Sequence, residues 1–340
     1  MISTPADAPA GPAIGRLDEV IGAFDAVPGG RTLDPAALLA DTRAVIQSAL
    51  GGTFGTPSAP RVGGVAADAI AGVSLAPESL AAGSRLYAAH CAHCHGLAGS
   101  GRGFGATYLY PHPRDFRAGV FKVGSGITKP TARRLGRLLR EGVPGSSMPM
   151  FDLISDADIE ALVGYVIHLS VRGEVETRLI RGVLDDELGL TVDDVPGEAA
   201  RSVGTMVRAW ATAVEPEPVP GINEGIAGED AVRRGHELFV GAAGCVSCHT
   251  NYGRAERYQY DIWGGAARPA DVTQKPSDYR WGHRPADLAH VVRHGIAGAR
   301  MPASTLADGE VADIVAFVRA AGAGRLPDDV RGRLYPAGTK

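Results

Sequence analysis

Cys91-Ala92-His93-Cys94-His95 is the most informative stretch of the chain, and its pattern returns as Cys245-Val246-Ser247-Cys248-His249. Two cysteines three positions apart, with a histidine directly after them, form the attachment pattern of c-type haem. Thiols one helical turn apart can reach the two vinyl groups on one edge of a porphyrin. The next residue, His95 or His249, is then placed to bind the iron. The two stretches therefore predict two covalently bound haems c.

A CxxC pair also has simpler explanations, because it occurs in redox-active thiol sites and as half of a zinc site. The chain has four cysteines, and the two motifs use all of them. Each pair is followed by its own histidine at the same position. The haem interpretation is therefore favoured for both Cys91–Cys94 and Cys245–Cys248.

The composition is typical of a folded globular protein, since 45% of the 340 residues are hydrophobic and 21% are charged. The formal net charge of -4, without a basic tract, argues against nucleic acid as a partner. No run approaches the ~18–20 apolar residues of a membrane span, so we expect no transmembrane segment. Haem attachment to CxxCH motifs takes place outside the bacterial cytoplasm, which predicts a periplasmic or otherwise extracytoplasmic protein. Residues 1–30 show neither the basic start nor the apolar core of an export signal.

Composition and repeats divide the chain into five expected parts. These are an N-terminal arm rich in Ala, Gly and Pro, a first haem domain, an acidic linker, a second haem domain and a C-terminal tail, at residues 1–76, 77–173, 174–225, 226–325 and 326–340. The linker has eleven acidic and four basic residues and closes with prolines typical of a stiff spacer. In the arm, Asp34-Pro35 predicts the start of a helix that ends before Gly51.

Both haem domains show the same order of three predicted helices, without a convincing strand pattern. In the first domain the helices begin near Glu78, at Pro130-Thr131 and at the capping box Ser155–Asp158. In the second domain, the segment from Gly235 to Phe239 repeats the segment from Gly83 to Tyr87. This internal duplication predicts an all-α protein built from two tandem domains of one kind.

Methionine is the expected second iron ligand in each domain. Met148 and Met301 each lie six positions after a glycine and directly before a proline. A thioether is a soft, neutral ligand, and His/Met ligation favours Fe(II). The alternative is that each methionine only fills a gap in the core. Met150 is the rival at the first site, but the repeat places Ala303 opposite it.

The other histidines are not expected to bind iron. His90 and His93 flank the first motif and are predicted to lie at the surface, while His112 lies between two prolines. His168 falls on a face of the third predicted helix. Four histidines of the second domain have no counterpart at matching positions of the first: His236, His283, His290 and His294.

With these residues in place, 77–173 and 226–325 each resemble a class I cytochrome c domain. The resemblance rests on the haem motif, the Met-Pro loop and the final amphipathic helix. It implies two tandem cytochrome c-like domains, all-helical, with one haem edge exposed for electron exchange. Two further segments, 111–122 and 169–176, look like a subgroup of bacterial multihaem cytochromes c from respiratory chains.

An electron carrier, rather than an enzyme, is the predicted function. Two haems with His/Met ligation would relay electrons between a redox protein donor and acceptor in a bacterial respiratory or oxidative chain. A dihaem cytochrome c peroxidase is the alternative, since that class has a similar length and two CxxCH motifs. A peroxidase needs one iron with an open position, whereas here each motif has its own Met-Pro.

One predicted helix has an unusual concentration of positive charge. It carries Arg133, Arg134, Arg137 and Arg140 and leads directly into the Met148 loop. Such a cluster could steer an acidic partner to the first haem in a salt-sensitive way. The alternative is an ordinary solvated helix face.

Overall fold

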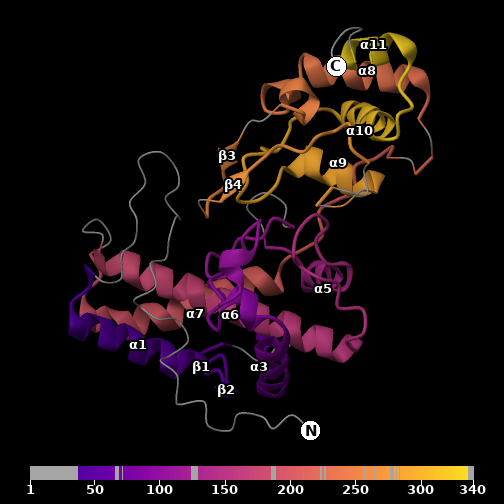
Figure 1. Cartoon of the computed structure of the whole chain (residues 1–340). Coiled ribbons are helices and arrows are strands. Elements are labelled where there is room, and N and C mark those ends of the chain that lie inside the picture. Colours follow the sequence, from indigo (N-terminus) through magenta and orange to yellow (C-terminus); the bar gives the residue numbers. More distant parts are fainter. Residues whose placement is uncertain are drawn as a thin grey trace.

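The chain folds into two helical bodies that meet along one side, as the computed structural model shows (Figure 1). The first body holds the helices labelled α1 to α7, and the second holds α8 to α11. The structure describes residues 37–65, 69–70, 72–123, 129–184, 189–222, 224–225, 227–255, 258–263, 265–275, 279–280, 282 and 284–335. Most of the N-terminal arm, the predicted helix start at Asp34-Pro35 and His283 lie outside these residues.

The centre of the first body is a crossing of two helices. Four helices make up this part of the body: α3 (Pro77–His90), α4 (Ala92–His95), α5 (Ala132–Glu141) and α6 (Asp156–Leu184). Where α3 crosses α6, a methyl group at Gly83 would overlap the carbonyl oxygen of Ala161, so glycine permits the close approach. Tyr87 and Tyr165 are buried beside this point, with ring centroids 5.3 Å apart.

Local signals place the ends of these helices as the sequence predicts. The Thr131 hydroxyl accepts a hydrogen bond from the Arg134 amide at 3.1 Å and so caps α5. Gly142, with φ of 68°, ends the same helix in the left-handed conformation that glycine adopts without strain. The Ser155 hydroxyl accepts from the Asp158 amide at 3.2 Å and caps α6. The three helix starts predicted for the first domain are confirmed.

The N-terminal helix ends later than the sequence predicts. α1 (Ala40–Phe54) passes through Gly51 and ends at Phe54, so the predicted end before Gly51 is wrong. Glycine lowers helix propensity by only ~1 kcal/mol, and the buried residues on both sides outweigh that cost. Ile46, Leu50 and Phe54 are buried against α6 and α7.

The segment expected as an acidic linker belongs largely to the first body. The expected division at 173/174 falls inside α6, which continues to Leu184. The short η3 (Val192–Asp194) leads into α7 (Val195–Ala211), which packs on α1 and α6. Apolar residues at helical spacing explain this packing, because α7 buries one continuous face: Val195, Ala199, Val203, Val207 and Trp210. A shorter extended stretch follows α7 and reaches the second core at Val219.

The second body repeats the helix crossing of the first. Its elements are α8 (Glu229–Val240), η4 (Cys245–Ser247), η5 (Thr250–Gly253), α9 (Pro285–His294), α10 (Asp308–Gly322) and α11 (Asp328–Leu334). At the crossing of α8 and α10, a methyl group at Gly235 would overlap the carbonyl oxygen of Asp313. The region expected as a C-terminal tail contains α11, because Val330 and Leu334 bury their side chains in the second core.

Strands are minor in the described part of the chain. β1 (Gly55–Thr56) pairs with β2 (Ala59–Pro60), and β3 (Gln259–Tyr260) pairs with β4 (Ala266–Ala267), both antiparallel and two residues long. The all-α prediction is confirmed. Among the described residues, no helix is both long and apolar enough to span a bilayer.

Candidate functional site

The first CxxCH motif lies at the junction of α3 and α4. Cys91 is buried at the end of α3, whereas Cys94 and His95 are half-buried on α4. The Nδ1 atom of His95 lies 3.0 Å from the carbonyl oxygen of Arg114. A carbonyl can only accept, so Nδ1 carries the proton and Nε2 keeps its lone pair. The ring also stacks on Phe116, with centroids 4.6 Å apart.

The second motif holds its histidine in the same way. Cys245 begins η4, Cys248 follows this turn, and His249 comes next. The Nδ1 atom of His249 donates to the carbonyl oxygen of Ala270 at 2.8 Å, which again leaves Nε2 free as a metal ligand. A hydrogen bond from the second ring nitrogen is the usual way in which a metal-binding histidine is oriented.

Burial favours the neutral form of both histidines. It lowers the pKa of His95 to about 4, and the pKa of His249 is lowered for the same reason. A neutral imidazole is the form that binds a metal. None of the four cysteines pairs with another in a disulfide, and burial raises the pKa of Cys91 to about 12. A buried thiol of high pKa does not suit thiolate redox chemistry, which depends on a lowered pKa.

The carbonyls that hold the histidines belong to a repeated Pro-x-Asp turn that the sequence reasoning missed. The turn is Pro113-Arg114-Asp115 in the first body and Pro269-Ala270-Asp271 in the second. The Asp115 carboxylate accepts from the Arg117 amide, and the Asp271 carboxylate accepts from the Thr273 amide, both at 2.9 Å. Aligning the two halves beyond their helices would have found this turn.

The glycine-rich loop after the first motif packs against this turn. A methyl group at Gly101 would overlap the Pro113 carbonyl, and one at Gly103 would overlap the His93 carbonyl. Glycines beside a CxxCH motif can let the backbone pass close to a flat cofactor. In the structure, the close approach of one backbone segment to another already requires them.

The two methionine loops share a backbone hydrogen bond and a glycine turn. The Val143 amide donates to the Met148 carbonyl at 3.2 Å, and the Ile296 amide donates to the Met301 carbonyl at 3.0 Å. In both loops the preceding glycine has a positive φ and leaves no room for a methyl group beside the methionine carbonyl. Met148 packs partly buried against the first core, whereas Met150 is 63% exposed.

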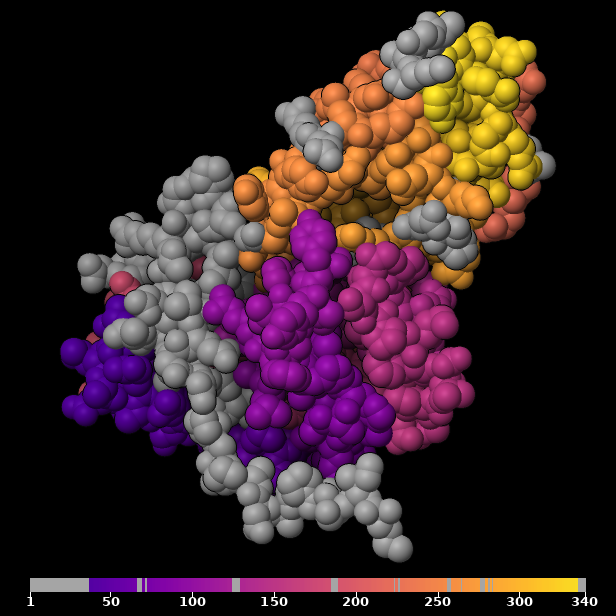
Figure 2. All heavy atoms as spheres, in the orientation of Figure 1, coloured from indigo at the N-terminus to yellow at the C-terminus, as the bar shows by residue number. Residues whose placement is uncertain are grey.

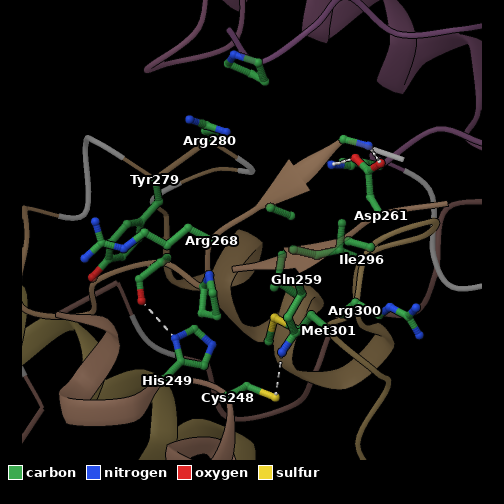
Figure 3. A pocket seen from close by; sticks show the side chains of 18 of the residues that line it. Cys248, His249, Gln259, Asp261, Arg268, Tyr279, Arg280, Ile296, Arg300 and Met301 are labelled. Atoms are coloured by element: carbon green, nitrogen blue, oxygen red, sulfur yellow. Dashed lines mark hydrogen bonds and ion pairs between the residues drawn. The ribbon is translucent and has the colours of Figure 1, made fainter. Parts of the chain in front are cut away.

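A large cavity opens beside the second motif. It has a volume of about 1680 Å³, and Cys248, His249 and Met301 all line it (Figure 3). The Gln259 amide nitrogen lies 3.5 Å from the Cys248 sulfur. Residues of the first body close part of the wall, and the surface is hollowed where the two bodies meet (Figure 2).

Three of the four arginines of the α5 cluster form ion pairs within the molecule, whereas Arg133 is exposed. Arg134 pairs with Glu215 at 3.3 Å, and Arg137 pairs across the bodies with Asp287 at 3.7 Å. Arg140 pairs with Asp156 and also donates to carbonyls that follow the Met148 loop. The repeat has the same feature, since Arg293 pairs with Asp308. These arginines therefore tie helices and loops together.

The remaining described histidines lie either at the surface or against other protein groups. His90 and His93 are exposed, as predicted, and the Nε2 atom of His236 lies 3.0 Å from the Tyr252 hydroxyl. His168 is completely buried on α6, between Tyr165 and Phe54. The rings of His290 and His294 lie 4.9 Å apart on α9, and the Nδ1 atom of His112 lies 3.3 Å from the Ala106 carbonyl.

Each body thus combines a helix crossing, paired thiols followed by an oriented neutral histidine, and a methionine loop, the features of a c-type cytochrome domain. The free Nε2 atoms and the cavity beside the second motif fit covalently attached haem. The chain belongs to the family described as cytochrome c oxidase, cbb3-type, subunit III, whose model matches residues 78–166 and 230–318. The prediction of two tandem cytochrome c-like domains is confirmed. Domains of this kind carry c-type haem and transfer electrons.

A solved structure supports the same fold. The chain is similar to a chain of the Kuenenia stuttgartiensis reducing HAO-like protein complex, with a TM-score of 0.52 and 22% identity. The match covers 71% of this chain and 95% of the other. The search of curated proteins found no match.

Proposed function

We propose that the protein is a dihaem electron carrier with one covalent haem c in each body. Cys91 and Cys94 hold the first haem, and Cys245 and Cys248 hold the second. The axial ligands are His95 with Met148 at the first site and His249 with Met301 at the second. Bound haem supplies a one-electron Fe(III)/Fe(II) couple, and His/Met ligation favours the Fe(II) form.

The observation that carries this proposal is that the same kind of hydrogen bond orients both histidines. His95 and His249 each give Nδ1 to a backbone carbonyl and keep Nε2 available. A histidine kept only for core packing has no need of one tautomer, whereas a metal ligand does. Two methionine loops closed by the equivalent backbone hydrogen bond accompany them.

Relay between two redox proteins is the role that this ligand set supports. Two protein ligands at each site would leave no coordination position open for peroxide, which favours transfer over catalysis. We place the protein on the extracytoplasmic side of a bacterial membrane, between a donor and an acceptor of a respiratory or oxidative chain. The basis for this location is the site of CxxCH haem attachment and not a signal in the chain.

Replacing the methionines tests the ligand assignment. In the oxidised wild-type protein we expect two methionine-to-iron charge-transfer signals in the visible spectrum. Met148→Leu and Met301→Leu should each remove one signal and lower the potential of that haem, by a fraction of the roughly 0.8 V over which axial ligands tune haem.

Met150→Leu is the matched control, because Met150 lies two positions further along the same loop and is exposed. It should leave both signals and both potentials unchanged. Loss of the first signal in Met150→Leu, but not in Met148→Leu, would reverse the assignment at the first site.

A further inference from the structure

Part of the wall of the cavity beside the second motif comes from the first body. The contributing residues include Ser100–Gly103, the turn around Arg114 and Lys122. The same turn holds the proximal histidine of the first motif. One segment of the chain therefore faces both candidate haem sites.

Arg114 has a different contact at each of its ends. Its carbonyl oxygen accepts from His95, and its guanidinium carbon lies 3.5 Å from the centre of the Trp263 ring in the second body. Burial lowers the pKa of Arg114 to about 10, so the guanidinium stays charged at neutral pH. A cation on an indole face at this distance is attracted by the ring quadrupole.

Trp263 in turn supports the Met301 loop. A methyl group at Gly298 would overlap the far edge of the Trp263 ring, which therefore lies directly on the backbone three residues before Met301. The adjacent Ile262 amide donates to the Gly298 carbonyl at 3.0 Å. The Trp263 indole N–H has no hydrogen-bond partner among the described side chains and backbone, so stacking holds the ring in place.

A buried ion pair fixes the loop that carries Trp263. Lys122 of the first body pairs with Asp261 at 2.9 Å, and their side chains are only 12% and 9% exposed. The other oxygen of Asp261 accepts from the amides of Trp263 and Gly265. The loop is thus anchored to the first body both by its carboxylate and by its indole ring.

The equivalent position in the first body lacks this support. Gly145 corresponds to Gly298 in the repeated loop, and the nearest atom to a methyl group there would be the Arg280 side chain at 3.7 Å. The Met148 loop therefore has no aromatic ring pressed against its backbone at that glycine. The contact through Trp263 is specific to the second site.

We infer that Arg114 and Trp263 form an inter-body strut that positions Met301 for the second haem. The strut runs from the turn that holds His95, through the guanidinium and the indole ring, to Gly298 in the Met301 loop. Arg114 and Trp263 are positioning residues, since they act through Met301. This inference rests on the proposed His/Met ligation.

The test is the axial ligation of the second haem in Arg114→Ala. This variant keeps the backbone carbonyl that holds His95 and leaves the second core untouched, so both haems should remain attached. The fraction of the second haem without methionine bound should rise roughly 2- to 30-fold, the range that a cation–π contact supplies. The potential of that haem should fall, while the first haem keeps its signal and its potential.

Three further variants separate the strut from general effects. Trp263→Ala should repeat the effect, and the double variant should add little to either single change, because both remove one contact. Arg114→Lys should restore part of the ligation, since it keeps the cation but loses the planar stack. Arg133→Ala, an exposed arginine on α5, is the control for loss of charge alone.

Two results would overturn the inference in distinguishable ways. If the second haem has the same methionine signal and the same potential in Arg114→Ala and Trp263→Ala as in Arg133→Ala, the strut does not position Met301. If the wild-type protein itself shows no methionine signal from the second haem, the proposed ligation fails first and the strut fails with it.

Discussion

At the level of single residues, the two proposed iron ligands differ from the buried His168 in their hydrogen bonding. His95 and His249 each have one nitrogen bound to a carbonyl oxygen. His168 is completely buried on α6, and neither of its ring nitrogens has a hydrogen-bond partner within the described structure. Its neighbours are the Tyr165 and Phe54 rings, with the charged Arg172 one helical turn away. Burial, and secondarily Arg172, lowers the pKa of His168 to about 3.

This histidine should make the first body sensitive to acid. Between pH 6.5 and about 3 the unfolded chain binds a proton at His168 and the folded protein does not, so stability falls as the pH falls. His168→Phe removes this proton uptake. When the pH falls from 7.5 to 5, the free energy of unfolding should fall by about 2 kcal/mol less in the variant than in the wild type. Urea denaturation at the two pH values measures this difference. Equal losses in the two proteins would show that His168 does not contribute.

At the level of elements, both bodies depend on a helix crossing that only glycine permits. Gly83 lies in α3 against the carbonyl of Ala161, and Gly235 lies in α8 against the carbonyl of Asp313. An interior helix position normally favours alanine over glycine by ~1 kcal/mol. Here the close backbone approach outweighs that preference, because no side chain fits between the two helices.

Alanine at the crossing should therefore destabilise the first body. Gly83→Ala must push α3 away from α6, at a cost of ~1–3 kcal/mol from overpacking. Gly204→Ala is the matched control, since Gly204 lies inside α7 with nothing within 4 Å of an added methyl group. It should stabilise the protein by up to ~1 kcal/mol. Thermal unfolding of both variants checks the opposite signs; stabilisation by Gly83→Ala would contradict the packing described here.

At the level of the whole molecule, two separate cores are joined by charged and aromatic contacts. One core lies around α3, α6 and α7, and the other around α8 and α10. The contacts between the bodies include the ion pairs Lys122–Asp261 and Arg137–Asp287. The Tyr110 hydroxyl also donates to the Ala266 carbonyl at 3.0 Å.

Separate cores predict that each body keeps its haem when the other loses it. Replacing both cysteines of one motif by alanine, at Cys91 and Cys94 or at Cys245 and Cys248, should halve the haem that survives acid-acetone extraction. The mass of the chain should show two haems in the wild type and one in each variant. A variant that loses both haems would show instead that the two bodies mature as one unit.

The amino-acid sequence alone indicates the chemistry and the repeat of this protein. The CxxCH motifs, the Met-Pro loops and the helix caps at Thr131 and Ser155 each act within a few residues, so their spacing along the chain is enough to recognise them. The starts of α5 and α6 follow from such local signals.

The hydrogen-bond and ion-pair partners that come from distant segments could be identified only from the tertiary structure. The Arg114 and Ala270 carbonyls reach the histidines from separate turns, and the arginines of α5 meet acids on other elements. Likewise, α6 runs past the expected domain boundary because α1 and α7 pack along it. Such contacts depend on which surfaces meet after the helices have formed. Local periodicity and capping therefore do not encode them.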